Sequence, residues 1–364
     1  MRVLFAGGGT GGHLYPGLAI ARAMQRIDPR VEPLFIGAHR GIEKNILPNS
    51  GFPYELLDLH PLYRSQPWNN WKTLRGALSA WSKLGRVVQS NRPALAVGTG
   101  GYASGIALAY AKMHRIPYIL QEQNSFPGLT TRFFSRYAAQ VHNGFPEAAG
   151  FLKPGARTRV FDSGNPIEPP PNPLPDKHAG RSAWNFPAGS GRVMLVYGGS
   201  QGSKAINDVV AAWIAKGLPD DLYVIWATGQ GTHSQYVNLE SDRVRVRAYL
   251  SPVSEAYAVT DFALSRGGAI ATAELCAWGI PPIVVPLPTA AADHQTANAR
   301  ALAAAGAAEM ILQKDLTVES LDRAVRALLA DPALLEARSL AVRRRARPNA
   351  AEEIARHALE LASK

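Results

Sequence analysis

The sequence predicts an α/β protein of two doubly wound, Rossmann-like domains that face a central cleft. Apolar runs that read as strands alternate with helix-like segments along almost all of the 364 residues. An apolar run followed by a glycine-rich turn occurs twice, at residues 3–13 and again at residues 193–203. Because a helix-like segment follows each turn, we expect the backbone N–H groups of both turns to face ligands.

The expected strands are short, continuous apolar runs, which is typical of parallel strands buried on both faces. They cover residues 3–6, 32–36, 94–97, 118–121 and 140–142 in the first half, and 192–197, 223–228, 244–248, 262–264 and 282–286 in the second. A proline-rich stretch beginning at Gly164 predicts the boundary between the halves. Residues 350–363 read as a last helix, with Asn349 as its N-cap.

The net charge of +11 is unevenly distributed. Residues 1–163 carry 19 Lys and Arg against 8 Asp and Glu, whereas residues 164–345 carry 17 of each kind. A basic first half predicts a polyanionic partner, such as nucleic acid, an acidic membrane surface or a phosphorylated lipid. The single cysteine, Cys276, excludes an internal disulfide and lies in an apolar stretch where we expect it to be buried.

The first glycine turn satisfies G-x-G-x-x-G through Gly7, Gly9 and Gly12. A dinucleotide site also needs an acidic residue at the end of the next strand, and that strand ends Gly37-Ala38 instead. His13 closes the turn. It could act as a general base, or it could cap the helix and orient a substrate, and the sequence leaves both open.

Three segments of the second half predict a nucleotide-sugar site. The turn at residues 198–203 suits a diphosphate, and Arg266 with Gly267 and Gly268 offers a second anion-binding turn. The carboxylate of Glu274 could accept hydrogen bonds from both hydroxyls of a ribose. A further loop, residues 293–295, could contact sugar hydroxyls.

An amphipathic segment at residues 67–88 has tryptophan and leucine at helical spacing, bordered by cations. It is either a membrane-surface contact or a stripe that faces the core, and both interpretations remain open. The membrane interpretation involves Trp68, Trp71, Lys72, Leu74, Arg75, Leu78 and Trp81.

Taken in order along the chain, these segments resemble the MurG family, bacterial transferases that add N-acetylglucosamine to lipid I in peptidoglycan synthesis. The resemblance rests on residues 7–13, 98–105, 121–124, 128–130, 164–166, 198–202, 266–274 and 293–295. It implies the GT-B fold, in which the C-terminal helix returns to the first domain. Residues 1–163 with 346–364 would then bind lipid I and face the membrane, and residues 164–345 would bind the UDP-sugar donor.

The resemblance implies inverting transfer of N-acetylglucosamine from UDP-N-acetylglucosamine to the muramyl sugar of undecaprenyl-diphosphate-linked lipid I, which yields lipid II. No cofactor or metal is expected. His13 is the expected base, with Glu122 as the alternative. The expected acceptor contacts are His13, Gly101, Tyr102 and Asn124. The expected donor contacts are Thr10, Gly11, Gly12, Asn124, Ser200, Gln201, Arg266, Gly268, Ala269, Glu274, His294 and Gln295.

The resemblance also implies a cytoplasmic protein held peripherally on the anionic inner face of the cell membrane, with no nucleic-acid partner. It leaves open association with a cell-wall synthesis complex. Two positions depart from the family pattern, since Gln121 replaces a histidine and Glu168 replaces an arginine. The alternatives are a GT-B transferase with another lipid acceptor and a non-catalytic nucleotide-sugar-binding membrane adaptor. A UDP-sugar epimerase and an NAD-dependent dehydrogenase are less favoured.

Overall fold

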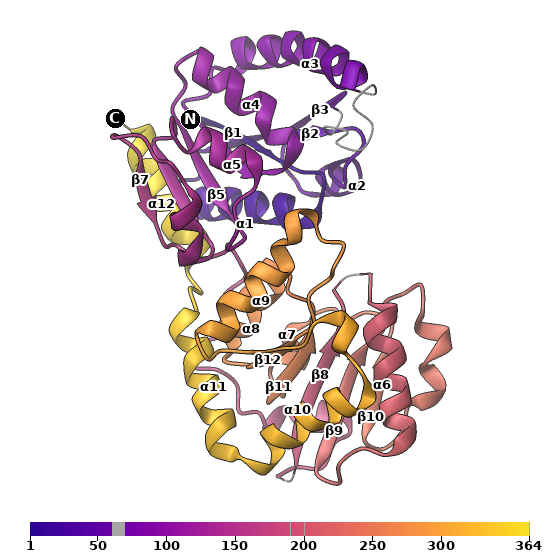
Figure 1. Ribbon diagram of the computed structural model, residues 1–364. Helices are drawn as coiled ribbons and strands as arrows, with labels where there is room; N and C mark the ends of the chain where they lie inside the picture. Colours follow the sequence, from indigo (N-terminus) through magenta and orange to yellow (C-terminus); the bar gives the residue numbers. More distant parts are fainter. Residues whose placement is uncertain (60–69, 190, 200, 364) are drawn as a thin grey trace. The chain divides into compact units, whose positions relative to one another are not determined.

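The computed structural model confirms an α/β fold with two parallel sheets (Figure 1). It describes residues 1–59, 70–189, 191–199 and 201–363, without the side chains of residues 70–75, 77 and 78. The chain divides into two compact units, Met1–Glu168 with Asn349–Lys364, and Pro169–Pro348. The divisions after residues 168 and 348 lie five and three residues later than those suggested by the sequence.

The first unit contains a seven-stranded sheet in the order β3-β2-β1-β4-β5-β6-β7, and its paired strands run parallel. In chain order the strands are β1 Arg2–Gly7, β2 Glu32–Ala38, β3 Tyr54–Leu57, β4 Leu95–Gly100, β5 Tyr118–Glu122, β6 Gln140–Asn143 and β7 Arg159–Phe161. Strands β1, β4 and β5 are buried along most of their length, which explains their continuous apolar sequences.

Helices cover this sheet, and the last of them comes from the C-terminus (Figure 1). They are α1 Gly11–Ile27, α2 Glu43–Ile46, α3 Asn70–Asn91, α4 Gly101–Met113, α5 Leu129–Phe134 and α12 Ala350–Ala362, with short 3₁₀ turns η1 Leu47–Asn49 and η3 Pro146–Phe151. Helix α12 packs against α1, where Ile354, Ala355 and Ala358 are completely buried. Asn349 occupies the N-cap position, as expected, although its side chain makes no capping hydrogen bond.

A buried polar cluster also attaches α12 to the sheet. The hydroxyl of Ser163 donates to Glu353 Oε1 at 3.0 Å and lies 2.9 Å from His142 Nδ1. Burial lowers the pKa of His142 to about 3, so this imidazole is neutral at physiological pH. The cluster therefore orients α12 through hydrogen bonds that include a neutral imidazole.

The second unit contains a six-stranded parallel sheet in the order β10-β9-β8-β11-β12-β13. Its strands are β8 Arg192–Tyr197, β9 Leu222–Ala227, β10 Val244–Arg247, β11 Phe262–Ser265, β12 Pro282–Val284 and β13 Glu309–Met310. Its helices are α6 Lys204–Lys216, α7 Ser254–Tyr257, α8 Ala269–Trp278, α9 His294–Ala304, α10 Val318–Ala330 and α11 Pro332–Arg345. Its 3₁₀ turns are η4 Ala179–Trp184, η5 His233–Gln235, η6 Val237–Leu239, η7 Ala291–Asp293 and η8 Gln313–Asp315.

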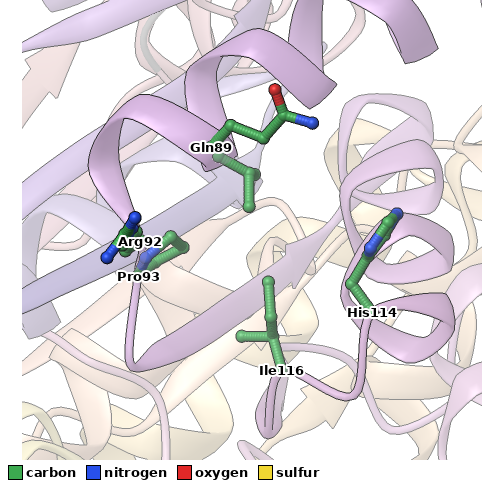
Figure 2. A pocket seen from close by; sticks show the side chains of 6 residues that line it. Gln89, Arg92, Pro93, His114 and Ile116 are labelled. Atoms are coloured by element: carbon green, nitrogen blue, oxygen red, sulfur yellow. The ribbon is translucent and has the colours of Figure 1, made fainter.

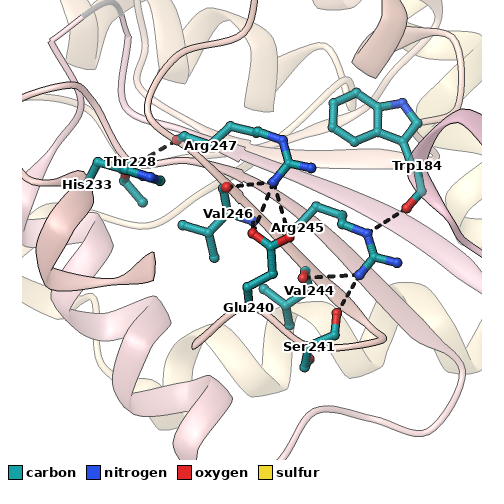
Figure 3. A network of polar contacts seen from close by, with 9 residues as sticks. All are labelled: Trp184, Thr228, His233, Glu240, Ser241, Val244, Arg245, Val246 and Arg247. Carbon is teal, nitrogen blue, oxygen red and sulfur yellow. Dashed lines mark hydrogen bonds and ion pairs between the residues drawn. The ribbon is translucent and has the colours of Figure 1, made fainter. Parts of the chain in front are cut away.

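Two arginines of the edge strand β10 hold neighbouring segments against it (Figure 3). Arg245 donates from Nε to the carbonyl of Trp184 and from Nη2 to that of Asn185, both at 2.6 Å. Arg247 donates to Glu240 Oε2 at 3.0 Å. These contacts attach neighbouring loops to an edge that could otherwise pair with another chain.

The position of the single cysteine agrees with the sequence. Cys276 is buried in α8, as expected, and burial raises the pKa of its thiol to about 12. Among the residues that the structure describes, no helix combines the length and apolar composition that a membrane span needs.

Because α12 is packed against α1, we expect truncation of a buried α12 side chain to destabilise the first unit. Ile354→Ala leaves a cavity beneath α1 and should lower the free energy of unfolding by about 2–5 kcal/mol. Urea denaturation followed by circular dichroism measures the change. The exposed Glu360→Ala in the same helix is the control, with an expected change within about 0.5 kcal/mol. Equal stability of the two variants would contradict the packing of α12 described here.

Candidate active site

At the carboxyl edge of the first sheet, His13 lies against the turn between β4 and α4. This turn has left-handed backbone at Gly100 and Gly101, with φ of 94° and 76°. A Cβ atom on Gly100 would lie 2.9 Å from His13 Cδ2, and one on Gly101 would lie 2.1 Å from the Gly8 carbonyl oxygen. Only glycine permits this approach, so the two turns of the sequence motif fit against each other.

Two threonines hold His13 in place. Its Nδ1 lies 3.1 Å from Thr10 Oγ1, and its carbonyl accepts a hydrogen bond of 2.7 Å from Thr99 Oγ1. The ring of Tyr102 lies beside Gly9, where a Cβ atom would approach it to 2.9 Å. The structure therefore brings together the predicted residues Thr10, His13 and Tyr102 at one sheet edge.

Glu122 is buried at the end of β5, and its oxygens are used within the loop that follows. Oε1 accepts from the backbone N–H of Asn124, and Oε2 from that of Gly128, both at 3.1 Å. Burial raises the pKa of this carboxyl despite those hydrogen bonds. This geometry favours a role in bracing the loop that carries Asn124 over a role as the catalytic base.

The departure at Gln121 is accommodated by a buried amide network. Gln121 Nε2 donates to Asn165 Oδ1 at 3.1 Å, and Asn165 Nδ2 donates to the carbonyl of Gln123 at 2.9 Å. Gln121 is completely buried. A side chain in this position is shielded from solvent and supports the loop from beneath.

In the second unit, the glycine turn between β8 and α6 offers a helix N-terminus at the carboxyl edge of the sheet. Gly199 and Gly202 have φ of 92° and 75°, and Ser203 caps α6 by accepting from the N–H of Ile206. Gln201 is exposed on the turn, and Ser200 lies outside the described residues. Backbone N–H groups at such a helix start suit a phosphate.

Arg266, expected to contact phosphate, makes several hydrogen bonds within the protein. Its buried guanidinium donates from Nη2 to Ser203 Oγ at 2.6 Å and to Gln313 Oε1 at 2.7 Å. From Nη1 it donates to the carbonyls of Val285 and Pro286 at 3.1 and 3.2 Å. These four protein acceptors make Arg266 a brace between three loops, and the expected phosphate contact stays a prediction.

Helix α8 carries two predicted features on consecutive turns. Gly268 is the N-cap, and Ala269 begins the helix. Glu274 lies one and a half turns later, and its Oε2 accepts a hydrogen bond of 2.9 Å from the hydroxyl of Tyr257. The half-buried carboxylate is therefore held by a residue that the sequence analysis did not identify.

His294 and Gln295 begin α9, after an unusual turn. Ala292 and Asp293 both have positive φ, 51° and 54°, which is strained for residues with a side chain and is often associated with functional sites. Gln295 Oε1 accepts from the N–H of Leu287 at 3.0 Å. This bond connects the start of α9 to the loop after β12.

The predicted membrane segment is only partly described. Trp68 lies outside the described residues, whereas Trp71, Lys72, Leu74, Arg75 and Leu78 lie in α3 without described side chains. Trp81 is half-buried and packs on Tyr110, with ring centroids 5.0 Å apart. For Trp81 the core-facing alternative is therefore the one that the structure supports.

A hollow of about 410 Å³ lies at the opposite edge of the first sheet, before β4 and β5 (Figure 2). It is lined by Val88, Gln89, Arg92, Pro93, His114 and Ile116. None of the predicted site residues lines it, so it is separate from the edge that carries His13.

Two Rossmann-like units with glycine turns at their sheet edges are typical of GT-B glycosyltransferases that use nucleotide sugars. The glycosyltransferase family 28 N-terminal domain matches residues 3–143, and the family's C-terminal domain matches residues 193–354. The chain belongs to glycosyltransferase family 28 and is a hexosyltransferase.

Relatives and solved structures agree with this family. Curated proteins from Prosthecochloris aestuarii and Salinibacter ruber are 36% and 37% identical, over 98% and 100% of this chain and 97% of each relative. Both are named UDP-N-acetylglucosamine–N-acetylmuramyl-(pentapeptide) pyrophosphoryl-undecaprenol N-acetylglucosamine transferase. The crystal structure of Acinetobacter baumannii MurG superposes with a TM-score of 0.79 and 27% identity, over 99% of both chains.

The fold alone does not separate transferases from epimerases. A UDP-GlcNAc 2-epimerase from Neisseria meningitidis, bound to UDP-GlcNAc, shares this fold with a TM-score of 0.65 at 16% identity, over 99% of this chain and 100% of that one. The family assignment therefore rests on sequence, and the fold supports it.

The bracing role of Arg266 makes a stability prediction. Arg266→Lys keeps the charge, but a lysine cannot donate to all four acceptors. The free energy of unfolding should therefore fall by about 1–3 kcal/mol. Thermal denaturation measures this, with the exposed Arg300→Lys as the control. Unchanged stability together with strongly reduced UDP binding would favour a phosphate contact of Arg266 over the bracing role.

Proposed function

We propose that this chain transfers N-acetylglucosamine from UDP-N-acetylglucosamine to the muramyl sugar of lipid I, and so produces lipid II. The observation that carries the proposal is the 36–37% identity, over almost the whole chain, to proteins named for that reaction. The geometry at the two sheet edges supports it, because each edge presents a glycine turn and candidate polar groups.

The donor is assigned to the second unit. The turn that precedes α6, with Ser200 and Gln201, would bind the diphosphate through N–H groups, aided by Gly268 and Ala269 at the start of α8. Glu274 would accept from the ribose hydroxyls. His294 and Gln295 would contact the sugar.

The acceptor is assigned to the first unit, with His13 as the base. With Nδ1 protonated and donating to Thr10 Oγ1, Nε2 is the basic nitrogen. The acceptor oxygen forms a bond to the anomeric carbon, the bond from that carbon to the UDP oxygen breaks, and the proton passes to Nε2. UDP leaves with the electron pair, and attack from the opposite face inverts the configuration.

Further contacts come from the same sheet edge. Gly101, Tyr102 and Asn124 would contact the acceptor, and Asn124 with Thr10, Gly11 and Gly12 would also contact the donor. Glu122 remains the alternative base, although its hydrogen bonds to the 124–128 loop favour the bracing role.

We assign peripheral attachment to the anionic inner face of the cell membrane to the basic first unit. An exposed apolar group supports this assignment, because Leu129 and Phe133 on α5 are 52% and 62% exposed and Tyr137 lies beside Phe133. Lys112 Nζ lies 3.5 Å above the Tyr137 ring. Exposed aromatics beside cations suit the headgroup region of an anionic bilayer.

The test of the reaction is UDP release from UDP-N-acetylglucosamine, with and without a short-chain lipid I analogue, in the presence of EDTA. Release that requires the analogue supports the transferase. Release that occurs only with another lipid, such as diacylglycerol, would favour the alternative acceptor. UDP binding without release in any acceptor assay would favour a non-catalytic nucleotide-sugar-binding adaptor.

The base assignment predicts that His13→Ala lowers turnover by about two to four orders of magnitude, since proton removal is lost. UDP affinity, measured by calorimetry, should stay within about twofold of the unchanged protein, because UDP is assigned mainly to the other unit and His13 is not one of the assigned donor contacts. Glu122→Gln is the comparison. A larger loss of turnover in that variant than in His13→Ala would make Glu122 the base.

The membrane assignment predicts that Phe133→Ser lowers binding to vesicles containing anionic lipid by roughly threefold or more. Co-sedimentation measures the bound fraction. Leu340→Ser, at a leucine that is 51% exposed on the second unit, is the matched control and should bind like the unchanged protein. Equal binding of both variants would remove α5 from the membrane contact.

A further inference from the structure

Two tyrosine hydroxyls form a hydrogen-bonded series that ends on the carboxylate of Glu274, which we assign to ribose binding. Tyr257, on α7, donates from its hydroxyl to Glu274 Oε2 at 2.9 Å. The hydroxyl of Tyr197, the last residue of β8, lies 3.4 Å from that of Tyr257. Three separate elements, β8, α7 and α8, therefore meet through two phenols and one carboxylate.

Counting the hydroxyl protons shows which group donates in each of these hydrogen bonds. A tyrosine hydroxyl has one hydrogen, and the shorter contact of Tyr257 is with a carboxylate, which only accepts when ionised. Tyr197 is therefore the donor to Tyr257. Burial raises the pKa of both phenols well above the usual range, so both remain protonated at working pH and both remain donors.

Packing restrains the two tyrosine rings in addition to the hydrogen bonds of their hydroxyls. Tyr257 is 3% exposed and Tyr197 is 9% exposed. Tyr257 contacts the rings of Tyr197 and Trp278, with centroids 6.4 and 5.7 Å away. A hydroxyl on a buried, immobilised ring is a more rigid anchor for a carboxylate than water is.

From this geometry we infer that Tyr257, supported by Tyr197, is a positioning residue that orients Glu274 and so determines recognition of the ribose hydroxyls. The inference rests on the proposed function, in which Glu274 binds the ribose. A carboxylate has about four lone-pair sites, so the bond from Tyr257 is compatible with acceptance from two ribose hydroxyls. A fixed carboxylate loses less conformational freedom on binding, which strengthens contacts to those hydroxyls in particular.

The experiment compares UDP with 2′,3′-dideoxy-UDP by calorimetry on the full chain. Tyr257→Phe keeps the ring and removes the donor. It should weaken UDP binding by about 3- to 10-fold and change dideoxy-UDP binding by less than about twofold. Tyr197→Phe should give a smaller loss in the same direction. A general disturbance of the fold would weaken both nucleotides equally, and that result would overturn the inference.

A matched control is present in the same unit. The hydroxyl of Tyr236 donates to the carboxylate of Asp208 at 2.7 Å, and Tyr236 is 5% exposed. Tyr236→Phe therefore removes a tyrosine–carboxylate hydrogen bond from another buried ring, here to the exposed Asp208, and should leave the preference for UDP over dideoxy-UDP unchanged. A reduced preference in this variant as well would also contradict a specific role for Tyr257.

Glu274→Ala separates failure of the inference from failure of the proposed ribose site. If Glu274→Ala leaves the preference for UDP intact, the ribose assignment is wrong and the inference falls with it. If Glu274→Ala abolishes the preference but Tyr257→Phe does not, only the inference is wrong. The inference further requires that Tyr257→Phe has no additional effect on UDP binding in the Glu274→Ala background.

Discussion

Close approach of backbone at the carboxyl edges of two parallel sheets is the constraint on which the candidate site depends. In the first unit, the Gly8 carbonyl lies where a side chain on Gly101 would begin, and His13 occupies the space that Gly100 leaves. In the second unit, a Cβ on Gly202 would lie 2.1 Å from the carbonyl of Thr228. Parallel pairing places each turn at the edge where ligands of such folds bind.

The features that could be predicted from sequence are those that follow from local pattern. Continuous apolar runs predicted the central strands, because strands buried on both faces tolerate few polar residues. The glycine turns predicted where helices begin after the strands, and the apolar surroundings of Cys276 predicted its burial. The order of the motifs along the chain carried the family resemblance, and the resemblance implied the reaction and the return of the last helix. That helix packs on α1.

The features that could not be predicted depend on partners distant in sequence. The hydrogen bonds that Arg266 makes within the protein are one example, because its acceptors include Ser203 and Gln313, which no local pattern connects to it. Tyr257 lies on another element, 17 residues before Glu274, and no motif in the sequence pointed to it. Trp81 fitted a membrane stripe as well as a core stripe, because helical spacing alone does not identify the surface that a helix faces.

The central claim is that the nucleotide is recognised by the turns of the second unit. Hydrogen exchange of the full chain, measured by mass spectrometry with and without UDP, tests it directly. The account predicts the strongest slowing of exchange around residues 198–207 and 266–275, and a weaker effect at residues 7–13, where Thr10, Gly11 and Gly12 are assigned additional donor contacts. Protection centred on residues 7–13 with none in the second unit would contradict the account, because it would place the nucleotide at the edge that we assign to the acceptor.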